Sequence, residues 1–211
     1  MYVAIEGVIG VGKTTLARLL QPAFDAEILL EVFEENPFLS DFYSDRQRYA
    51  FQTQIFFLLS RYHQQRRTVN ELLATGKTLI ADYTFAKDAL FARINLKGDE
   101  LDMYYKVHEA LAEKIQKPDL LVYLQASTDT LMQRIALRDR PYERQMERSY
   151  IHELNLAYEE FFSKPFDHTP VLTIDTNNLD IVRNPEHLKL IENRIRQSLN
   201  LTPFQQSLPL P

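Results

Sequence analysis

The sequence contains no cysteine, so disulfide bonds, thiol chemistry and cysteine-based metal sites are excluded. Basic residues are too few for a general nucleic-acid surface, because 29 acidic residues face 24 basic ones and the net charge is −5. No apolar run approaches the roughly 20 residues that a membrane span needs. The chain also enters an apolar strand pattern at once, with no basic leader and no cleavage site. We therefore expect a cytoplasmic protein with no nucleic-acid partner and no membrane contact.

Glycine is scarce as well, with five residues in 211, yet three of the five fall within "EGVIGVGKTT" at residues 6–15. This stretch matches the phosphate-binding pattern G-x-x-x-x-G-K-[ST] in full. Its lysine reaches the β- and γ-phosphates of a nucleotide, and its threonine hydroxyl is suited to Mg²⁺. We expect the whole loop to bind ATP, that is, Gly7, Val8, Ile9, Gly10, Val11, Gly12, Lys13, Thr14 and Thr15.

Hydrophobic periodicity predicts the fold class. Short apolar runs at 2–7, 27–32, 78–83, 119–126 and 171–175 are typical of buried strands. Helical spacing lies between them, at 13–24, 49–76, 101–118 and 127–140. Alternating strands and helices predict an α/β protein with a parallel sheet covered by helices on both faces. We expect a single domain over residues 1–200, followed by a proline-containing tail at 201–211.

Carboxylates stand at the ends of two predicted strands, where ligands of an open α/β sheet collect. Glu31 follows the second run and Asp82 the third. Beside a phosphate loop, one acid can hold Mg²⁺ or its water shell while the other accepts a proton from an attacking hydroxyl. Glu34 and Glu35 compete with Glu31 for its role.

Arginines gather after the fourth predicted strand, in "MQRIALRDRPYERQMER". Arginine binds phosphate oxygens bidentately and stays charged at any working pH. A mobile lid at residues 134–148 could close Arg134, Arg138 and Arg140 over a triphosphate. The alternative is a solvated, salt-bridged helix, because acidic residues are interleaved with the arginines.

The ordered combination of these motifs resembles the deoxynucleoside kinase family, in particular the bacterial branch that phosphorylates purine deoxynucleosides. The resemblance spans residues 1 to about 195. It is carried by the phosphate loop, "LLEVFEENPFLSDFY", "YAFQTQIFFLLSR", "ADYTFAKDALF" and "RIALRDRPYE". It implies a P-loop kinase fold with a five-stranded parallel sheet and an arginine-rich lid. It also implies a homodimer that uses ATP and Mg²⁺.

The resemblance implies a role for each matching residue. Glu31 would accept the proton of the deoxyribose 5′-hydroxyl, and Asp82, with Thr14, would position Mg²⁺. The remaining roles are holding the sugar 3′-hydroxyl (Tyr43, Glu143), reading the base (Gln54, Arg61, Asp88), and contacting the donor nucleotide and its phosphates (Lys13, Arg134, Arg138, Arg140).

Two departures from the family pattern bear on the proton acceptor. Tyr83 stands where the family usually has an arginine after the acid of strand three, so Arg61 or a lid arginine would have to compensate. Val32 stands where many members have a proline after the catalytic glutamate.

Two other functions stay open at this point. A nucleoside-monophosphate kinase of the thymidylate type shares loop, lid and sheet, and Arg61 could bind its acceptor phosphate. The second open function is a non-catalytic nucleotide switch. A switch that binds GTP should contain a guanine-reading N-K-x-D motif, and the nearest match, "DTNNLD", lacks the lysine. The sequence leaves the preferred base undetermined.

Overall fold

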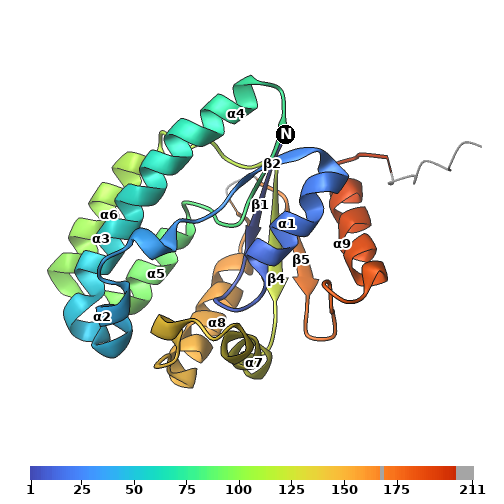
Figure 1. Cartoon of the computed structure of the whole chain (residues 1–211). Helices are drawn as coiled ribbons and strands as arrows, with labels where there is room; N and C mark the ends of the chain where they lie inside the picture. The colour runs from blue at the N-terminus through green and yellow to red at the C-terminus, as the bar shows by residue number, and fades with distance from the viewer. Residues whose placement is uncertain (167–168, 203–211) are drawn as a thin grey trace, which may run out of the picture.

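The computed structural model describes residues 1–166 and 169–202, so most of the tail expected at 201–211 lies outside the described residues. A five-stranded parallel sheet forms the centre of the fold, in the order β2-β3-β1-β4-β5 (Figure 1). Its strands are β1 (Tyr2–Glu6), β2 (Ala26–Leu29), β3 (Thr78–Ala81), β4 (Leu120–Gln125) and β5 (Val171–Asp175). The predicted α/β class and the five-stranded parallel sheet are confirmed.

The strand register brings several loops to one edge of the sheet. Val3 of the central strand β1 pairs with Ile80 of β3 on one side and with Leu120 of β4 on the other. Because all strands are parallel, the loops that follow their carboxyl ends emerge together. The phosphate loop, Glu31 and Asp82 all lie in loops of this kind.

Helices cover the sheet on both sides (Figure 1). Helix α1 (Lys13–Phe24) packs on strands β1 to β3 and contacts α9 (Pro185–Ser198). Helices α3 (Arg46–Gln64), α5 (Lys87–Asn95) and α6 (Gly98–Ala112) pack against one another, and α8 (Arg148–Phe162) packs against α5. The remaining helical elements are α2 (Leu39–Ser44), α4 (Asn70–Ala74), α7 (Thr128–Arg138), two 3-10 turns (Phe33–Glu35, Pro141–Glu143) and one π turn (Gln65–Val69).

The alternation of side chains along β1 explains why the sheet needs helices on both faces. Val3 and Ile5 belong to the large core cluster that includes Leu16 of α1. Tyr2 and Ala4 belong to a second cluster, which includes Val69. Successive side chains of a strand point to opposite faces, so a strand that is apolar throughout is buried on both.

Several element boundaries differ from the sequence expectations. The helix expected at 49–76 begins at Arg46 and is interrupted by the π turn, and the helix expected at 101–118 ends at Ala112. The strand expected at 27–32 ends at Leu29, so Glu31 lies in the following loop. The apolar pattern therefore extends past the real boundary after Leu29, where Val32 is exposed. Gly76, at a φ of 74°, follows α4 as expected for a residue that ends a helix.

Ser127 caps the N-terminus of α7, because its hydroxyl accepts a hydrogen bond from the Thr130 amide. Among the described residues, no helix combines the length and the apolar character needed to cross a membrane.

Candidate active site

The phosphate loop forms the turn between β1 and α1. Gly7, Gly10 and Gly12 all have positive φ, at 147°, 87° and 105°. A Cβ on Gly7 would lie 2.5 Å from the Leu124 carbonyl oxygen, so only glycine fits there. The Lys13 ammonium lies along the inside of the loop and donates to the carbonyl oxygens of Gly7 at 2.7 Å and Val8 at 3.3 Å.

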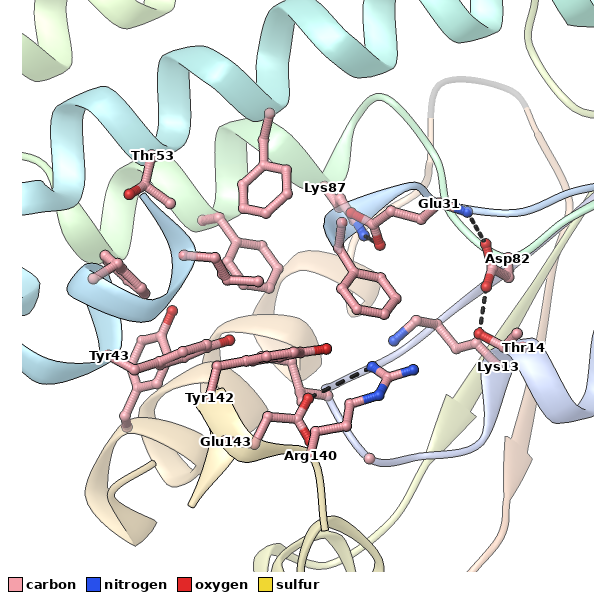
Figure 2. Close-up of a pocket in the computed structure, with 18 of the residues that line it drawn as sticks. Lys13, Thr14, Glu31, Tyr43, Thr53, Asp82, Lys87, Arg140, Tyr142 and Glu143 are labelled. Atoms are coloured by element: carbon pink, nitrogen blue, oxygen red, sulfur yellow. Dashed lines mark hydrogen bonds and ion pairs between the residues drawn. The ribbon is translucent and has the colours of Figure 1, made fainter. Parts of the chain in front are cut away.

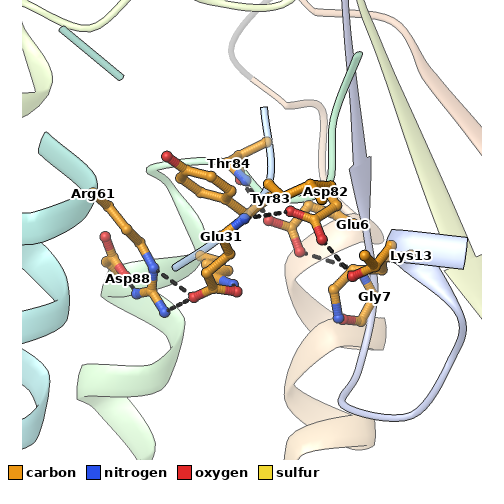
Figure 3. A network of polar contacts seen from close by, with 12 residues as sticks. Glu6, Gly7, Lys13, Glu31, Arg61, Asp82, Tyr83, Thr84 and Asp88 are labelled. Atoms are coloured by element: carbon orange, nitrogen blue, oxygen red, sulfur yellow. Dashed lines mark hydrogen bonds and ion pairs between the residues drawn. The ribbon is translucent and has the colours of Figure 1, made fainter. Parts of the chain in front are cut away.

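Glu6, the last residue of β1, ties this loop to neighbouring elements (Figure 3). Its buried carboxylate accepts hydrogen bonds from the Gly7 amide at 3.2 Å, the Thr84 amide at 2.6 Å and the Tyr158 hydroxyl at 3.1 Å. The first glycine of the loop is therefore coupled to the segment after β3 and to α8.

Asp82 connects the phosphate loop with the segment that follows β2 (Figure 2). One carboxylate oxygen accepts a hydrogen bond from the Thr14 hydroxyl, and the other accepts one from the Glu31 amide at 2.8 Å. The predicted metal pair, Thr14 and Asp82, is thus brought into contact. A hydroxyl and a carboxylate are the hard oxygen ligands that suit Mg²⁺, so these residues fit the ion.

Two cations hold the Glu31 carboxylate (Figure 3). Arg61 donates to Oε1 through Nε at 2.8 Å and also through Nη2, and the Lys87 ammonium donates to Oε2 at 2.6 Å. Burial acts to raise the pKa of Glu31, but Arg61 and Lys87 outweigh it and hold the pKa well below the ordinary range of a glutamate. Glu31 is therefore a carboxylate at neutral pH. Of its competitors, Glu35 is exposed, and the side chain of Glu34 lies outside the described structure.

Most of the predicted site residues line one cavity at the sheet edge (Figure 2). The cavity wall contains Lys13, Thr14, Glu31, Tyr43, Gln54, Arg61, Asp82, Arg138, Arg140 and Glu143. Asp88 is an exception, because it is fully buried behind Arg61, with which it forms an ion pair.

Aromatic rings form the side of the cavity away from the phosphate loop. Tyr43 and Tyr142 stack with ring centroids 6.3 Å apart, and the Arg140 guanidinium lies 4.2 Å from the ring centre of Phe33. The Thr53 hydroxyl also lines this cavity, and it is buried without a hydrogen-bond partner among the described residues. An unpaired buried hydroxyl is costly, so it suits a polar group of a bound ligand.

The arginines of the expected lid divide into three groups. Arg138 forms a bidentate pair with Glu143, with Nη2 2.6 Å from Oε1, and Arg140 lies 3.7 Å from the same carboxylate. Arg134 instead donates to the Val11 carbonyl oxygen at 3.2 Å and to the Thr176 carbonyl oxygen at 2.6 Å. The third group, Arg144 and Arg148, forms exposed ion pairs with Asp139 and Asp129, as the salt-bridge alternative expects.

A second cavity lies on the other side of the loop. It is bounded by Gly10 to Gly12, by Arg134 and Arg138, and by the segment after β5, from Thr176 to Arg183. Arg138 lines both cavities, whereas Arg134 lines only the second one.

Sequence reasoning missed several residues of this site. Lys87, Thr53, Phe33 and Tyr142 line the first cavity, and the segment 176–183 lines the second. The only signal for Lys87 was a charged residue shortly after Asp82, inside "FAKDALF". Such a residue is usually solvated, so the signal was weak.

Together, the fold and the site define a P-loop kinase, in which a nucleotide phosphate site adjoins a cavity with an ionised carboxylate. The family model described as deoxynucleoside kinase matches residues 3–200. The chain therefore belongs to the deoxynucleoside kinase family, and the predicted enzyme class, an ATP-dependent deoxynucleoside kinase, is confirmed.

Individual proteins agree with this family. A deoxyguanosine kinase of Bacillus subtilis (strain 168) is 36% identical over 93% of this chain and 96% of its own length. A deoxyadenosine/deoxycytidine kinase of the same organism is 30% identical over 92% of this chain and 90% of its own. The structure of a deoxyadenosine kinase from M. mycoides with dCMP and dCDP bound superimposes with a TM-score of 0.82, at 28% identity, covering 93% of this chain and 100% of that one.

Proposed function

We propose that the protein transfers the γ-phosphoryl group of ATP to the 5′-hydroxyl of a purine deoxynucleoside, deoxyadenosine or deoxyguanosine, with Glu31 as the base. One observation carries this proposal: the ionised Glu31 lines the same cavity as Lys13 and Thr14 of the phosphate loop. A hydroxyl held by Glu31 therefore faces a phosphate held by the loop. Positioning and electrostatic stabilisation are the main sources of catalysis in phosphoryl transfer.

Each charged group has a place in this reaction. The deoxyribose 5′-hydroxyl donates a hydrogen bond to Glu31 and passes its proton to it as the oxygen attacks the γ-phosphorus. Lys13 and the loop amides hold the β- and γ-phosphates, while Arg138 and Arg140 lie across the cavity from the loop and neutralise the equatorial oxygens. Tyr43 and Glu143 hold the sugar 3′-hydroxyl at the far end.

Thr14 and Asp82 would hold Mg²⁺ beside these phosphates. The hydrogen bond between the Thr14 hydroxyl and the Asp82 carboxylate supports this pairing, because both oxygens can ligate one ion or its water shell. When bound, the ion neutralises charge on the β- and γ-oxygens.

The purine preference rests on the base-reading residues and on the relatives. Arg61 and Gln54 present donors and an acceptor to the cavity, and the unpaired Thr53 hydroxyl adds another polar group. Among the relatives are kinases named for deoxyguanosine and for deoxyadenosine/deoxycytidine. Deoxycytidine is therefore the most informative competing substrate.

A substrate panel tests the proposal. The four common deoxynucleosides, with ATP and Mg²⁺, are assayed for 5′-monophosphate, with dTMP as an additional acceptor. We expect the highest kcat/KM for a purine deoxynucleoside and no formation of dTDP. A preference for a pyrimidine deoxynucleoside would contradict the purine assignment, and phosphorylation of dTMP would favour the thymidylate-type alternative.

The variant Glu31→Gln tests the base. The amide keeps the size of the side chain and one hydrogen-bond acceptor, but it cannot take up the proton of the 5′-hydroxyl. We expect near-normal ATP binding and a loss of kcat of about 10² to 10⁴-fold, the usual contribution of a general base. Near-normal turnover would show that Glu31 is not the proton acceptor.

Three further assignments accompany this function. We propose that residues 1–200 form one kinase domain with a lid at 134–148, which the family match over residues 3–200 supports. A homodimer stays a prediction, supported by the exposed Leu59 of α3 and Met103 of α6, at 42% and 56% exposure. Sedimentation of the purified chain measures it. The cytoplasmic location also stays a prediction of the sequence.

A further inference from the structure

Lys87 is a buried cation inside the first cavity, although no motif of the sequence singles it out. It is the first residue of α5 and is only 5% exposed. Its ammonium lies 2.6 Å from Glu31 Oε2 and 5.6 Å from the ring centre of Tyr83. Burying a lysine is unfavourable unless it is paired, so this position needs an explanation.

Tyr83 does not supply the charge that an arginine would bring to its position. Its hydroxyl donates a hydrogen bond to Gln64 Oε1 at 2.6 Å. Lys87, four residues further along the chain, pairs with Glu31 instead. Figure 3 shows Glu31 and Tyr83 together, and Figure 2 shows Lys87 beside Glu31.

The two cations on Glu31 differ in their freedom. Arg61 is held on two sides, because its guanidinium also pairs with the fully buried Asp88. Within the described part of the chain, Glu31 is the only carboxylate that pairs with Lys87. An ammonium on a four-carbon stem can also change partners more readily than a planar guanidinium can. Arg61 therefore anchors Glu31, while Lys87 is able to leave it.

The reaction gives Lys87 a reason to leave. The O5′–Pγ bond forms as the bond from Pγ to the β-phosphate oxygen breaks, and that bond's electron pair departs with ADP. The proton of the 5′-hydroxyl moves to Glu31, which becomes neutral and loses its attraction for the ammonium. A phosphoryl group held by Lys13 would lie in the cavity that Glu31 and Lys87 also line, so its oxygens would offer the ammonium a new anionic partner.

We propose that Lys87 is a catalytic residue that exchanges partners during the transfer, pairing with Glu31 beforehand and binding an oxygen of the transferred phosphoryl group as Glu31 takes up the proton. This deepens the proposed function and rests on it. Lys87 stays an ammonium throughout, so the step changes only its partner. Lys87 thereby supplies the positive charge that Tyr83 does not, while Arg61 keeps Glu31 in place.

Three substitutions measure the effect. Lys87→Met removes the charge and keeps the length, Lys87→Arg keeps the charge, and Lys97→Met is the matched control at an exposed lysine. We expect Lys87→Met to lower kcat by about 100-fold or more, as for removal of one preorganised donor to transition-state charge. The deoxynucleoside KM should change little. Lys87→Arg should recover a large part of kcat, and Lys97→Met should match the wild type.

A double-mutant cycle separates contact with the phosphoryl group from support of Glu31. If Lys87 binds the phosphoryl oxygens, Lys87→Met should still lower kcat by about tenfold or more in the Glu31→Gln background. If it acts only by holding Glu31, the second substitution has no further effect, and that result overturns the proposal. Should Lys87→Met fail to fold, as judged by its melting curve, Lys87→Gln takes its place in the cycle.

The outcomes also distinguish this inference from the proposed function. Normal turnover by Glu31→Gln would refute the assignment of Glu31 as the base. The effect of Lys87→Met on kcat in the wild-type background does not depend on that result and is measured separately. Normal turnover by Lys87→Met, with Glu31→Gln inactive, leaves the proposed function intact and refutes the role of Lys87.

Discussion

Lys13 allows a quantitative prediction about nucleotide binding, because its ammonium lies in an electrostatically unfavourable place. Burial, followed by the charge of Lys87, lowers the pKa of Lys13 from 10.5 to about 8, although Glu6, Glu31 and Asp82 oppose the fall. At about 1.4 kcal/mol per pKa unit, the change corresponds to about 3 kcal/mol of unfavourable free energy below pH 8. Between pH 8 and 10.5 the unfolded chain binds the extra proton, so the unfolding free energy rises with pH there.

ATP reverses this effect, because its phosphates bring negative charge to the Lys13 ammonium and raise its pKa. Binding should therefore take up about half a proton at pH 8 and about 0.9 at pH 9, with ATP affinity falling as the pH rises through this range. The phosphate groups of ATP contribute little to this proton uptake at pH 8 to 9, since their second pKa is about 6. Calorimetric titration in two buffers of different ionisation enthalpy measures the uptake.

Two variants decide whether Lys13 is the group responsible. Lys13→Arg keeps a cation that does not titrate in proteins, so the uptake should disappear. Lys87→Met removes a neighbouring positive charge, so the pKa of Lys13 should rise and the uptake at pH 8 should fall. Uptake near zero across pH 7 to 9 in the wild type, or unchanged uptake in Lys13→Arg, would refute the reasoning.

Four other substitutions probe the site. Gly7→Ala places a Cβ 2.5 Å from the Leu124 carbonyl oxygen, so we expect loss of ATP binding and a lower melting temperature, checked by calorimetry. Asp82→Asn turns one of the two carboxylate acceptors, which face the Thr14 hydroxyl and the Glu31 amide, into a donor. Steady-state assays should show a higher Mg²⁺ requirement and a kcat about 10- to 100-fold lower. Glu143→Gln should raise the deoxynucleoside KM and Arg134→Met the ATP KM; equal effects on both substrates would contradict the division into two cavities.

The predictable parts of the fold and site are those encoded by local sequence. Buried parallel strands are continuous apolar runs, so all five were recognisable, although the second ends at Leu29 instead of continuing to Val32. The phosphate loop was recognisable because its glycines meet a steric demand within ten residues. Asp82 and Glu31 could be placed near it because parallel strands bring their carboxyl ends to one edge.

Residues whose role depends on a distant partner could not be predicted in the same way. Lys87 is an unremarkable residue in an amphipathic helix until α5 packs beside the loop that carries Glu31. Asp88, expected to face the base, is buried behind Arg61. The second cavity depends on the segment 176–183, which has no recognisable motif.

By itself, the sequence determined the α/β class, the phosphate loop, the two acids at the strand ends and the resemblance to deoxynucleoside kinases. These follow from periodicity and from short-range steric requirements. Only the tertiary structure decided which cations surround Glu31 and that Arg138 lines both cavities while Arg134 lines the second. Those features join distant parts of the chain, since Lys87 lies 56 residues from Glu31 and Arg134 lies 123 residues from Val11. Their charges interact strongly only once packing has excluded water between them.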